Sequence, residues 1–582
     1  MKLKKIVALV LVACLALSFA GCGCSKKTEG ISICLASEPE TLDPGLNAAL
    51  DGATMIVHLF SGLTKWDADG KTILPDCAVE IPEGVVNEDG TVTYTYTLKD
   101  GLKWSDGKAL TAGDFVFAWK RAANESFGAE YGYMFDVIKG YPNNLAVEAP
   151  DDKTVVVTLN NTINYWNELL AFPTYMPVRE DVVANEKWAA EASTYVCNGP
   201  YKISDWKHNQ LITLVKNEHY HEADKVTMPQ INCYLSDDNN AMLANYKSGN
   251  WHMIDNVPAG EITNLKKNSP NEFKTVGQLG TYFVCWNINE NMLPASSTLT
   301  GVAKERAQEE IRYALMLVLD RDYIVNSLSK AGEVPASSFV SMGLTDADGT
   351  EFYKNAGPSD EYAGYYNLDT FEANFAEAVE ILKKYYKYDE ATKTFTDGPK
   401  FTYLYNTDTV HEAIATYVQS AFQSVGVTIE LANVEWNTFL ETRNNGDFSV
   451  ARHGWVADYN DPITFLDMWT STSGNNDAQF GKGAHASLKA YSIDLTPYGY
   501  DIVVENGTWA ETYDVVISTI KTCTDSDTRY ALMHYAEDML MSTGCVGPIY
   551  YYTDLFLINP AVQGFYTNPL GYKYFMYTTI AE

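Results

Sequence analysis

Positive charge is scarce in this chain. Lysine and arginine number 42 against 75 aspartate and glutamate residues, which gives a formal net charge of −33 over 582 residues. Phosphate backbones and anionic headgroups repel such a surface, so nucleic acid and acidic lipids are poor partners. The excess of acid is typical of a protein kept soluble outside the cell.

Motifs of covalent chemistry are missing as well. G-x-S-x-G, H-E-x-x-H and the phosphate-binding glycine loop do not occur. No two carboxylates stand out as a glycosidase pair. We therefore expect neither an enzyme nor a resident cofactor or metal.

Cysteine pairing motifs are also absent. The ten cysteines are widely scattered and show no C-x-x-C spacing, which argues against a structural zinc site and a disulfide scaffold. Cys523 and Cys545 flank a helical segment and could pair outside the cell, an alternative that the sequence leaves open. Most of the others are expected to be small buried apolar residues.

Only one long apolar run occurs, and it lies at the N-terminus. Three lysines within residues 1–5 precede the apolar residues 6–19, and small residues then lead to Cys22. About 14 apolar residues are too few to span a bilayer, so residues 1–21 are predicted to be a secretory signal. The last four residues, Phe-Ala-Gly-Cys, resemble the bacterial lipobox, which implies a lipid anchor on Cys22 at the outer face of the cell membrane.

The length and periodicity of the chain predict several α/β lobes. At 582 residues it exceeds the size of one core. Residues 92–98 alternate with period two, as a strand does, and residues 305–329 and 371–388 show helical periodicity. Residues 401–405, 411–424 and 427–431 read as a βαβ unit, which predicts a mixed sheet with ligand crevices at strand ends.

The run at 451–462, Ala-Arg-His-Gly-Trp-Val-Ala-Asp-Tyr-Asn-Asp-Pro, concentrates the features of a ligand site. Gly454 permits another backbone to approach closely, and the two aromatic residues exclude water. A desolvated Asp458 would be costly unless it met a cation. Taken alone, the run is more typical of a strand that ends in an Asx or proline turn.

Several short segments, in a fixed order, resemble one family over nearly the whole chain. They are SEPETLDP at 37–44, LFSGL at 59–63, LKWSDG at 102–107, DFVFAW at 114–119, NGPYK at 198–202, YNT at 405–407, EW at 435–436, the run at 451–462 and PLGYKY at 569–574. The chain resembles the extracellular solute-binding protein of an oligopeptide ABC importer. The resemblance implies a periplasmic-binding-protein-like fold, with two ligand-enclosing lobes and an additional inserted lobe.

The resemblance also implies how a peptide would be held. Asp458 matches the aspartate that forms a salt bridge with the ligand's α-ammonium, and peptides with a blocked N-terminus would then be rejected. The backbone around Gly454 and Val456, and that around Ser61 and Leu63, match segments that sandwich the peptide as an added strand.

Other residues match positions at the far end and along the walls of that site. Arg452, Arg443 and His411 match residues that meet the ligand's C-terminal carboxylate, whereas Trp436, Trp455 and Tyr133 match aromatic residues that line pockets. Structural roles without ligand contact stay open: Arg443 could lie on the surface, His411 could cap a helix, and the two tryptophans could lie in the core.

Departures from the family pattern point to a different length or charge preference. Gly280 and Val456 match positions that carry a disulfide in Gram-negative members. Ser61 stands where glutamate is usual, and His453 stands where alanine is common. The histidines of His219-Tyr220-His221-Glu222 fall in a polar loop of the family, where asparagine and tryptophan are usual, so no metal site is expected.

We therefore predict a monomeric, membrane-tethered receptor that captures oligopeptides and passes them to ABC permease subunits. Lobe I is expected to comprise residues 28–75, 197–296 and 550–582, lobe II residues 76–196, and lobe III residues 297–549. Two lobes would close on the ligand about a hinge. A receptor of the same family for an oligosaccharide, a nickel complex or haem is the alternative, and a secreted hydrolase is a more distant one.

Overall fold

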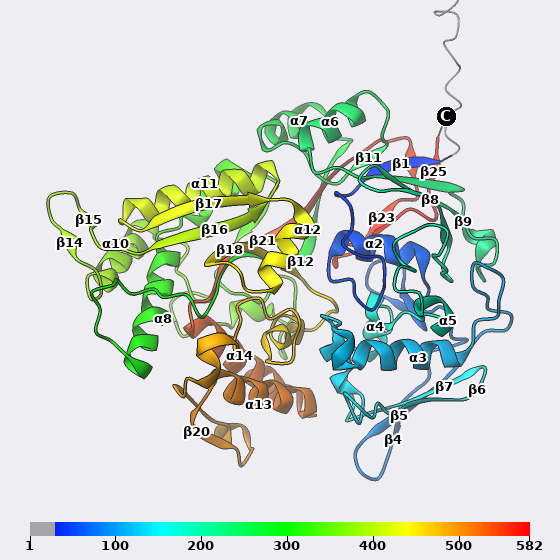
Figure 1. Cartoon of the computed structure of the whole chain (residues 1–582), viewed down its shortest axis with the longest axis horizontal. Helices are drawn as coiled ribbons and strands as arrows, with labels where there is room; N and C mark the ends of the chain where they lie inside the picture. The colour runs from blue at the N-terminus through cyan, green and yellow to red at the C-terminus, as the bar shows by residue number, and fades with distance from the viewer. Residues whose placement is uncertain (1–29, 582) are drawn as a thin grey trace, which may run out of the picture.

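The computed structural model describes residues 30–581, so the predicted signal segment and Cys22 lie outside the described residues. Two bodies of helices and strands lie on either side of a central pair of long strands, β12 (Phe273–Trp286) and β21 (Val546–Ile558) (Figure 1). Within residues 30–581, no helix combines the length and hydrophobicity needed to cross a bilayer.

One mixed sheet runs through both bodies. Its order is β17-β16-β18-β12-β21-β11-β1-β10-β9-β8, and β13 (Val334–Pro335) pairs with β21 beside this path. The β16–β17 and β1–β10 pairs are parallel, whereas β12 is antiparallel to both β18 and β21. This arrangement of strands and covering helices confirms the predicted α/β class.

The first half of the sheet carries the N-terminal strands. It consists of β1 (Ile31–Cys34), β8 (Tyr201–Lys207), β9 (Leu211–Lys216), β10 (Gln230–Tyr234) and β11 (Met253–Ile254). The helices of this body are α2 (Leu50–Leu59), α6 (Asn239–Lys247) and α7 (Ile262–Asn268). These elements come from segments far apart in the sequence.

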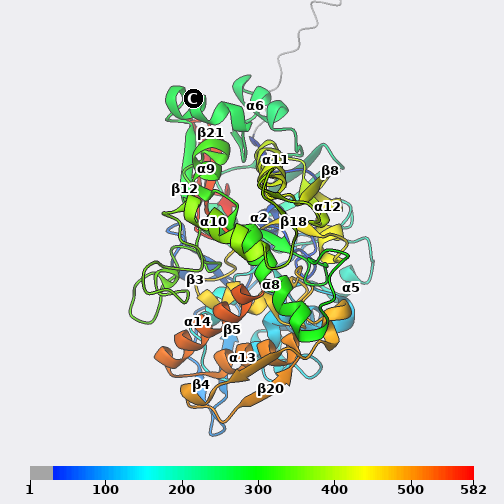
Figure 2. The same ribbon diagram turned by 90° about the vertical axis from the view of Figure 1, so that its left-hand side faces the viewer.

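The second half contains the predicted βαβ unit. β16 (Lys400–Asn406) and β17 (Thr428–Val434) are parallel neighbours joined by α11 (Thr409–Ser424), which confirms that prediction. β18 (Val450–Val456) lies between β16 and β12. The other helices of this body, seen from their outer side in Figure 2, are α8 (Gly301–Leu317), α10 (Phe371–Leu382), α12 (Trp436–Asn444), α13 (Trp509–Thr522) and α14 (Ser526–Ser542).

The bounds of two predicted helices were wrong. The helix expected at 305–329 is interrupted: α8 ends at Leu317, and a second helical segment consists of α9 (Arg321–Tyr323) and the π-helix η6 (Ile324–Ser329), which ends at the predicted residue. Asp320 starts this second segment, because its side chain accepts a hydrogen bond from the Tyr323 N–H at 2.9 Å. The helix expected at 371–388 ends at Leu382, and Tyr388 lies in the strand β14 (Tyr388–Asp389).

Residues 85–159 contain a separate antiparallel sheet, and this sheet with the helical segments between Ala112 and Val183 is here called the inserted body. Its order is β4-β5-β7-β6, with bounds Val85–Val86, Val92–Thr97, Thr154–Leu159 and Val147–Asp151. Helix α3 (Ala112–Ala123) packs against it and begins with a capping box between Thr111 and Asp114. In Figure 1 this body lies beneath the first half of the sheet.

The cysteines of residues 30–581 are free and buried in the structure, which includes both Cys523 and Cys545. The open alternative of a bond between those two is therefore not what the structure shows. Burial raises the pKa of the Cys545 thiol to about 11. Such thiols behave as small apolar residues and react poorly.

Candidate ligand-binding site

A cavity of about 390 Å³ lies where the three bodies meet. The start of α2 forms one wall, β18 and the first turns of α11 and α12 form another, and Tyr131 and Phe172 of the inserted body close it. This volume falls in the range of sites for small ligands. Eight of the predicted residues line it: Arg452, Gly454, Trp455, Val456, Asp458, Arg443, Trp436 and His411.

Beyond Ala451, the edge of β18 that faces this cavity has no neighbouring strand among residues 30–581. β12 pairs with residues 450–456 on one side, but β16 pairs on the other side only at Val450 and Ala451. The Ala457 N–H donates to the Leu279 carbonyl oxygen at 2.7 Å, so backbone groups of odd-numbered residues here point toward β12. Those of even-numbered residues, including Gly454 and Val456, therefore point to the open edge, where an extended peptide can add as a strand.

Gly454 is required by its surroundings. A Cβ atom at this position would lie 2.1 Å from the Tyr552 hydroxyl oxygen. Its N–H donates to Nδ1 of His453 at 2.8 Å, and Nε2 of His453 donates to Asp477 at 2.8 Å. Burial and the nearby Arg443 lower the pKa of His453 to about 4, which keeps the ring neutral. The histidine therefore stacks behind the strand, on Phe283 at 4.5 Å between ring centroids.

Asp458 is a desolvated carboxylate at the end of β18. The Tyr131 hydroxyl donates to one of its oxygens at 3.1 Å and the Thr464 hydroxyl to the other at 3.2 Å. Its residue exposure is 6%, and within residues 30–581 no lysine, arginine or histidine forms an ion pair with it. Burial and the neighbouring Asp467 raise its pKa well above the usual range. The site therefore holds a carboxylate whose cation has to come from outside.

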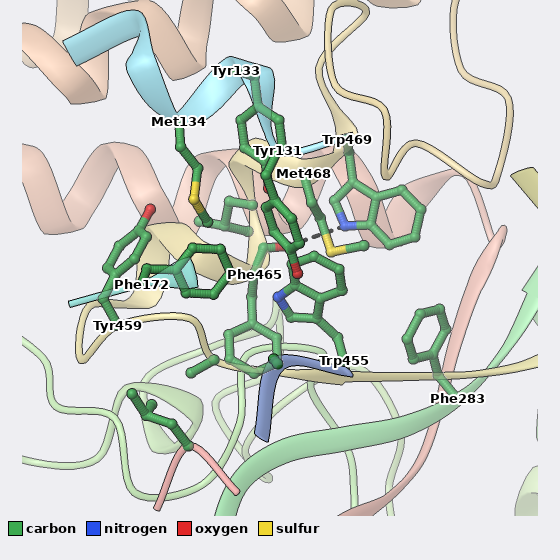
Figure 3. Close-up of a cluster of buried hydrophobic side chains, with 14 of the residues drawn as sticks. Tyr131, Tyr133, Met134, Phe172, Phe283, Trp455, Tyr459, Phe465, Met468 and Trp469 are labelled. Atoms are coloured by element: carbon green, nitrogen blue, oxygen red, sulfur yellow. Dashed lines mark hydrogen bonds between the residues drawn. The ribbon is translucent and has the colours of Figure 1, made fainter. Parts of the chain in front are cut away.

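Aromatic rings enclose this carboxylate. Figure 3 shows Tyr131 and Trp455 facing each other beside Phe172. The ring centroid of Tyr131 lies 6.1 Å from that of Trp455 and 4.8 Å from that of Phe172. Tyr133 is stacked behind Tyr131 and does not line the cavity. Of the two tyrosines in Tyr-Gly-Tyr, Tyr131 is thus the one that lines the site, and the sequence reasoning missed it.

Arg452 supplies the opposite charge. Its Nε donates to the Asn406 side chain at 2.8 Å, and its guanidinium lies over the rings of Trp436 and Phe439, 5.4 and 4.9 Å from their centroids. It is 7% exposed, and in the described part of the chain no acidic side chain forms an ion pair with it. A guanidinium in this setting is poised to take a carboxylate in two parallel hydrogen bonds.

The two companions predicted for Arg452 are less available. Arg443 is already paired with Asp477 at 2.5 Å, so its charge is compensated within the protein. Asp408, not His411, caps α11, because its side chain accepts the His411 backbone N–H at 3.0 Å. Burial and the nearby Arg452 lower the pKa of His411 to about 3, so its ring is neutral. It can donate a hydrogen bond to a ligand but offers it no charge.

The structure does not bring Ser61 and Leu63 to this cavity. Leu63 is fully buried in the core, and the Ser61 backbone exchanges hydrogen bonds with the Asn198 side chain at 3.1 and 2.9 Å. The wall opposite β18 is formed instead by residues 47–51, at the start of α2. Sequence reasoning missed this segment because its small apolar residues carry no chemical signature.

A second cavity, of about 500 Å³, lies beside Ser61. Asp76, His221 and Glu222 come together there as a group of potential metal ligands. Lys65 already places its ammonium between the two carboxylates, at 3.2 Å from Asp76 and 2.6 Å from Glu222. The carboxylates of Asp76 and Glu222 are thus compensated within the protein.

Contacts between the bodies close the first cavity. The Asn444 side chain donates to Glu130 at 2.7 Å, and the Asn460 N–H donates to Glu168 at 2.6 Å. Lys521 reaches Asp136 at 2.7 Å. These contacts join the second half of the sheet to the inserted body, so the structure is closed around the first cavity.

Comparison with known proteins gives the class. Residues 72–477 match the model of the bacterial extracellular solute-binding proteins, family 5. The chain belongs to this family. Among its relatives, the oligopeptide-binding protein OppA of Bacillus subtilis is 31% identical, with 98% of this chain and 97% of that protein covered.

Solved structures agree with the closed form described above. Haemophilus influenzae OppA, in complex with the peptide RPPGFSPFR, has a TM-score of 0.78 at 25% identity, covering 96% of this chain and 100% of that one. Escherichia coli MppA, a murein tripeptide binding protein, has a TM-score of 0.77 at 26% identity, covering 95% and 98%. The same protein in its unliganded open form reaches only 0.58 over the same coverage.

Proposed function

We propose that this chain captures oligopeptides outside the cytoplasm and delivers them to the permease of an ABC importer. The observation that carries the proposal is Asp458, a buried carboxylate without a cation at the end of an open strand edge. Two relatives named as oligopeptide-binding proteins support the same reading, one of them with a nonapeptide bound.

In the proposed mode of binding, the peptide contacts Asp458, Arg452 and the open edge of β18 together. The α-ammonium of the peptide pairs with Asp458, and its backbone adds to β18 alongside Gly454 and Val456. Main-chain hydrogen bonds are blind to side chains, so one site accepts many sequences. The terminal carboxylate goes to Arg452. Asp458 and Arg452 favour such a zwitterionic peptide over a neutral oligosaccharide, because each of these buried charged groups then pairs with a group of opposite charge on the ligand.

The proposed setting follows from the N-terminal segment. Residues 1–21 would direct export, and lipidation of Cys22 would hold the protein at the outer face of the membrane as a monomer beside its permease. Mass spectrometry of the purified N-terminus tests this step. A diacylglyceryl mass on a chain that begins at Cys22 is expected, and an unmodified Met1 would contradict it.

Thermal unfolding of the purified chain tests the ligand class. A pool of free peptides of three to eight residues at about a hundred times its dissociation constant should stabilise the fold by about 2.7 kcal/mol, whereas the N-acetylated pool should not. The shift should fall below about 1 kcal/mol in Asp458→Asn, because a 30-fold or larger loss of affinity leaves the pool at about three times its dissociation constant or less. If neither pool raises the midpoint, the peptide assignment is wrong, and metal complexes and sugars are the next ligands to try.

A further inference from the structure

One contact between the bodies that enclose the first cavity is made by the backbone. Gly474, in the loop 470–482 of the second half, donates its N–H to the Glu130 carbonyl oxygen of the inserted body at 3.2 Å. A Cβ atom on Gly474 would lie 2.3 Å from the Cα atom of Glu130 and 2.9 Å from its carbonyl oxygen. A backbone neighbour cannot turn aside as a flexible side chain can. Only glycine therefore fits this position in the closed structure.

The local backbone conformation at Gly474 does not itself require glycine. Its φ angle lies outside the left-handed region, in contrast to Gly481 and Gly483 of the same part of the chain, whose φ angles are 69° and 61°. Alanine can adopt the conformation of Gly474 without strain. The three atoms nearest to an added Cβ all belong to Glu130. The need for glycine thus arises from the neighbouring body and not from the loop.

The two residues of this contact belong to bodies that separate when the cavity opens. Arg121 of α3 holds the inserted body to the first half through two hydrogen bonds to Asp43, at 3.0 and 2.6 Å. The loop of the glycine is held to α13 in the second half, where the Ser471 N–H donates to Asp514 at 3.0 Å. The inserted body therefore moves with the first half, and the contact forms only when the two halves close.

We propose that Gly474 is a positioning residue for peptide capture, which sets how completely the receptor closes and thereby how tightly it holds any peptide. This inference rests on the proposed function and deepens it. Gly474 is not among the residues that line the cavity, so it acts on the ligand through its fit against Glu130. Incomplete closure leaves a bound peptide a path of exit and raises its dissociation rate. Such a loss affects every peptide alike, whereas the loss of a ligand contact affects only the peptides that make it.

Gly474→Ala in the full chain tests the inference. Titration calorimetry should show affinity lower by about tenfold to a hundredfold, by the same factor for trialanine and for Ala-Phe-Ala. The distance between a spin label on each half should shorten when peptide binds to the wild-type protein, and should shorten less in the variant. Gly260→Ala is the matched control, because a Cβ there meets no atom within 4 Å. It should keep wild-type affinity and closure.

A second variant keeps the test independent of how well the first one folds. Asn444 donates across the same contact to the Glu130 side chain at 2.7 Å, and Asn444→Ala removes this hydrogen bond without adding an atom. Affinity should fall by about twofold to tenfold, again equally for both peptides. If Gly474→Ala does not fold, wild-type affinity and closure in Asn444→Ala would overturn the inference.

The outcomes separate the inference from the proposed function. Equal affinity in the wild-type protein and Gly474→Ala would overturn the inference and leave peptide capture standing. Lower affinity with unchanged closure would overturn it too, because the loss would then come from the adjacent Asn475, which lines the cavity. If no peptide binds the wild-type protein, the proposed function fails, and closure is then followed with the solute that stabilises the fold. A wild-type protein that no solute closes would overturn both.

Discussion

The two cavities of this protein are similar in size and opposite in electrostatics. In the second, of about 500 Å³, the Lys65 ammonium lies between Asp76 and Glu222. In the first, of about 390 Å³, Asp458 and Arg452 have no ion-pair partner within residues 30–581. Charges compensated inside the protein stabilise its fold, whereas uncompensated ones become useful only when a ligand arrives. Uncompensated charge therefore marks the binding site better than volume does.

The sharpest test of this contrast is Asp458→Asn. Removing the carboxylate would leave the ammonium of a bound peptide buried without a counter-charge, which costs about 2–5 kcal/mol, or roughly 30-fold to several-thousand-fold in affinity. Titration calorimetry measures this loss of peptide affinity. The free protein should keep its unfolding midpoint, because the substitution removes an unpaired buried carboxylate. If this variant binds peptides with unchanged affinity, the uncompensated charge of Asp458 does not mark the binding site.

Lys65→Met should show the opposite pattern. It removes the ammonium between Asp76 and Glu222, although Glu222 keeps Lys225 at 2.7 Å and Asp76 keeps His221 at 3.1 Å. We expect a loss of about 2 kcal/mol in the free energy of unfolding, below the range for a buried pair because the Lys65 side chain is 24% exposed. Urea unfolding measures the loss. Peptide affinity should not change, and a large loss of affinity would mean that the second cavity takes part in binding.

Arg452→Gln should weaken binding by about tenfold and act on one end of the ligand only. The wild-type protein should prefer a free C-terminal carboxylate to the matching amide, and the variant should lose that preference. Arg443→Gln is the comparison, because Arg443 is already paired with Asp477 and should discriminate less between the two peptides. An equal loss of discrimination in both variants would assign the carboxylate to the pair of arginines.

The smallest effect expected is a proton linkage. In the empty protein, burial raises the pKa of Asp458 well above the usual range, and a bound ammonium would lower it again. Binding should therefore release up to one proton, and affinity should fall by at most tenfold per pH unit as the pH drops below the pKa of the empty protein. Calorimetry in buffers of different ionisation enthalpy measures the release. It should be absent in Asp458→Asn.

Residues that are contiguous in the sequence were the predictable part of this site. Gly454 and Asp458 belong to one run whose residue types indicate a desolvated ligand site, and the structure places both residues at the cavity. Tyr131 and residues 47–51 come from distant segments, and their place depends on how the bodies pack. No local pattern encodes that packing.

The misplaced Ser61 shows how a motif can mislead. LFSGL and NGPYK resemble the family strongly, but in the structure they pack against each other. A Cβ on Gly199 would lie 2.5 Å from the backbone of Leu59 and Phe60, and Asn198 bonds to the Ser61 backbone. Their residues are explained by close packing of two chain segments. A motif of this kind predicts the fold well and the ligand contacts poorly.

The neighbouring strands β12 and β21 determine how the two halves of the sheet can move. Both connections between the halves lie within one strand spacing, about 5 Å. Two joints so close together resist sliding but yield to bending, and the ladder between them is interrupted between Gly277 and Thr281. We therefore expect opening to be a rotation of one half of the sheet about this pair of strands. A distance measured between a label on each half would follow it.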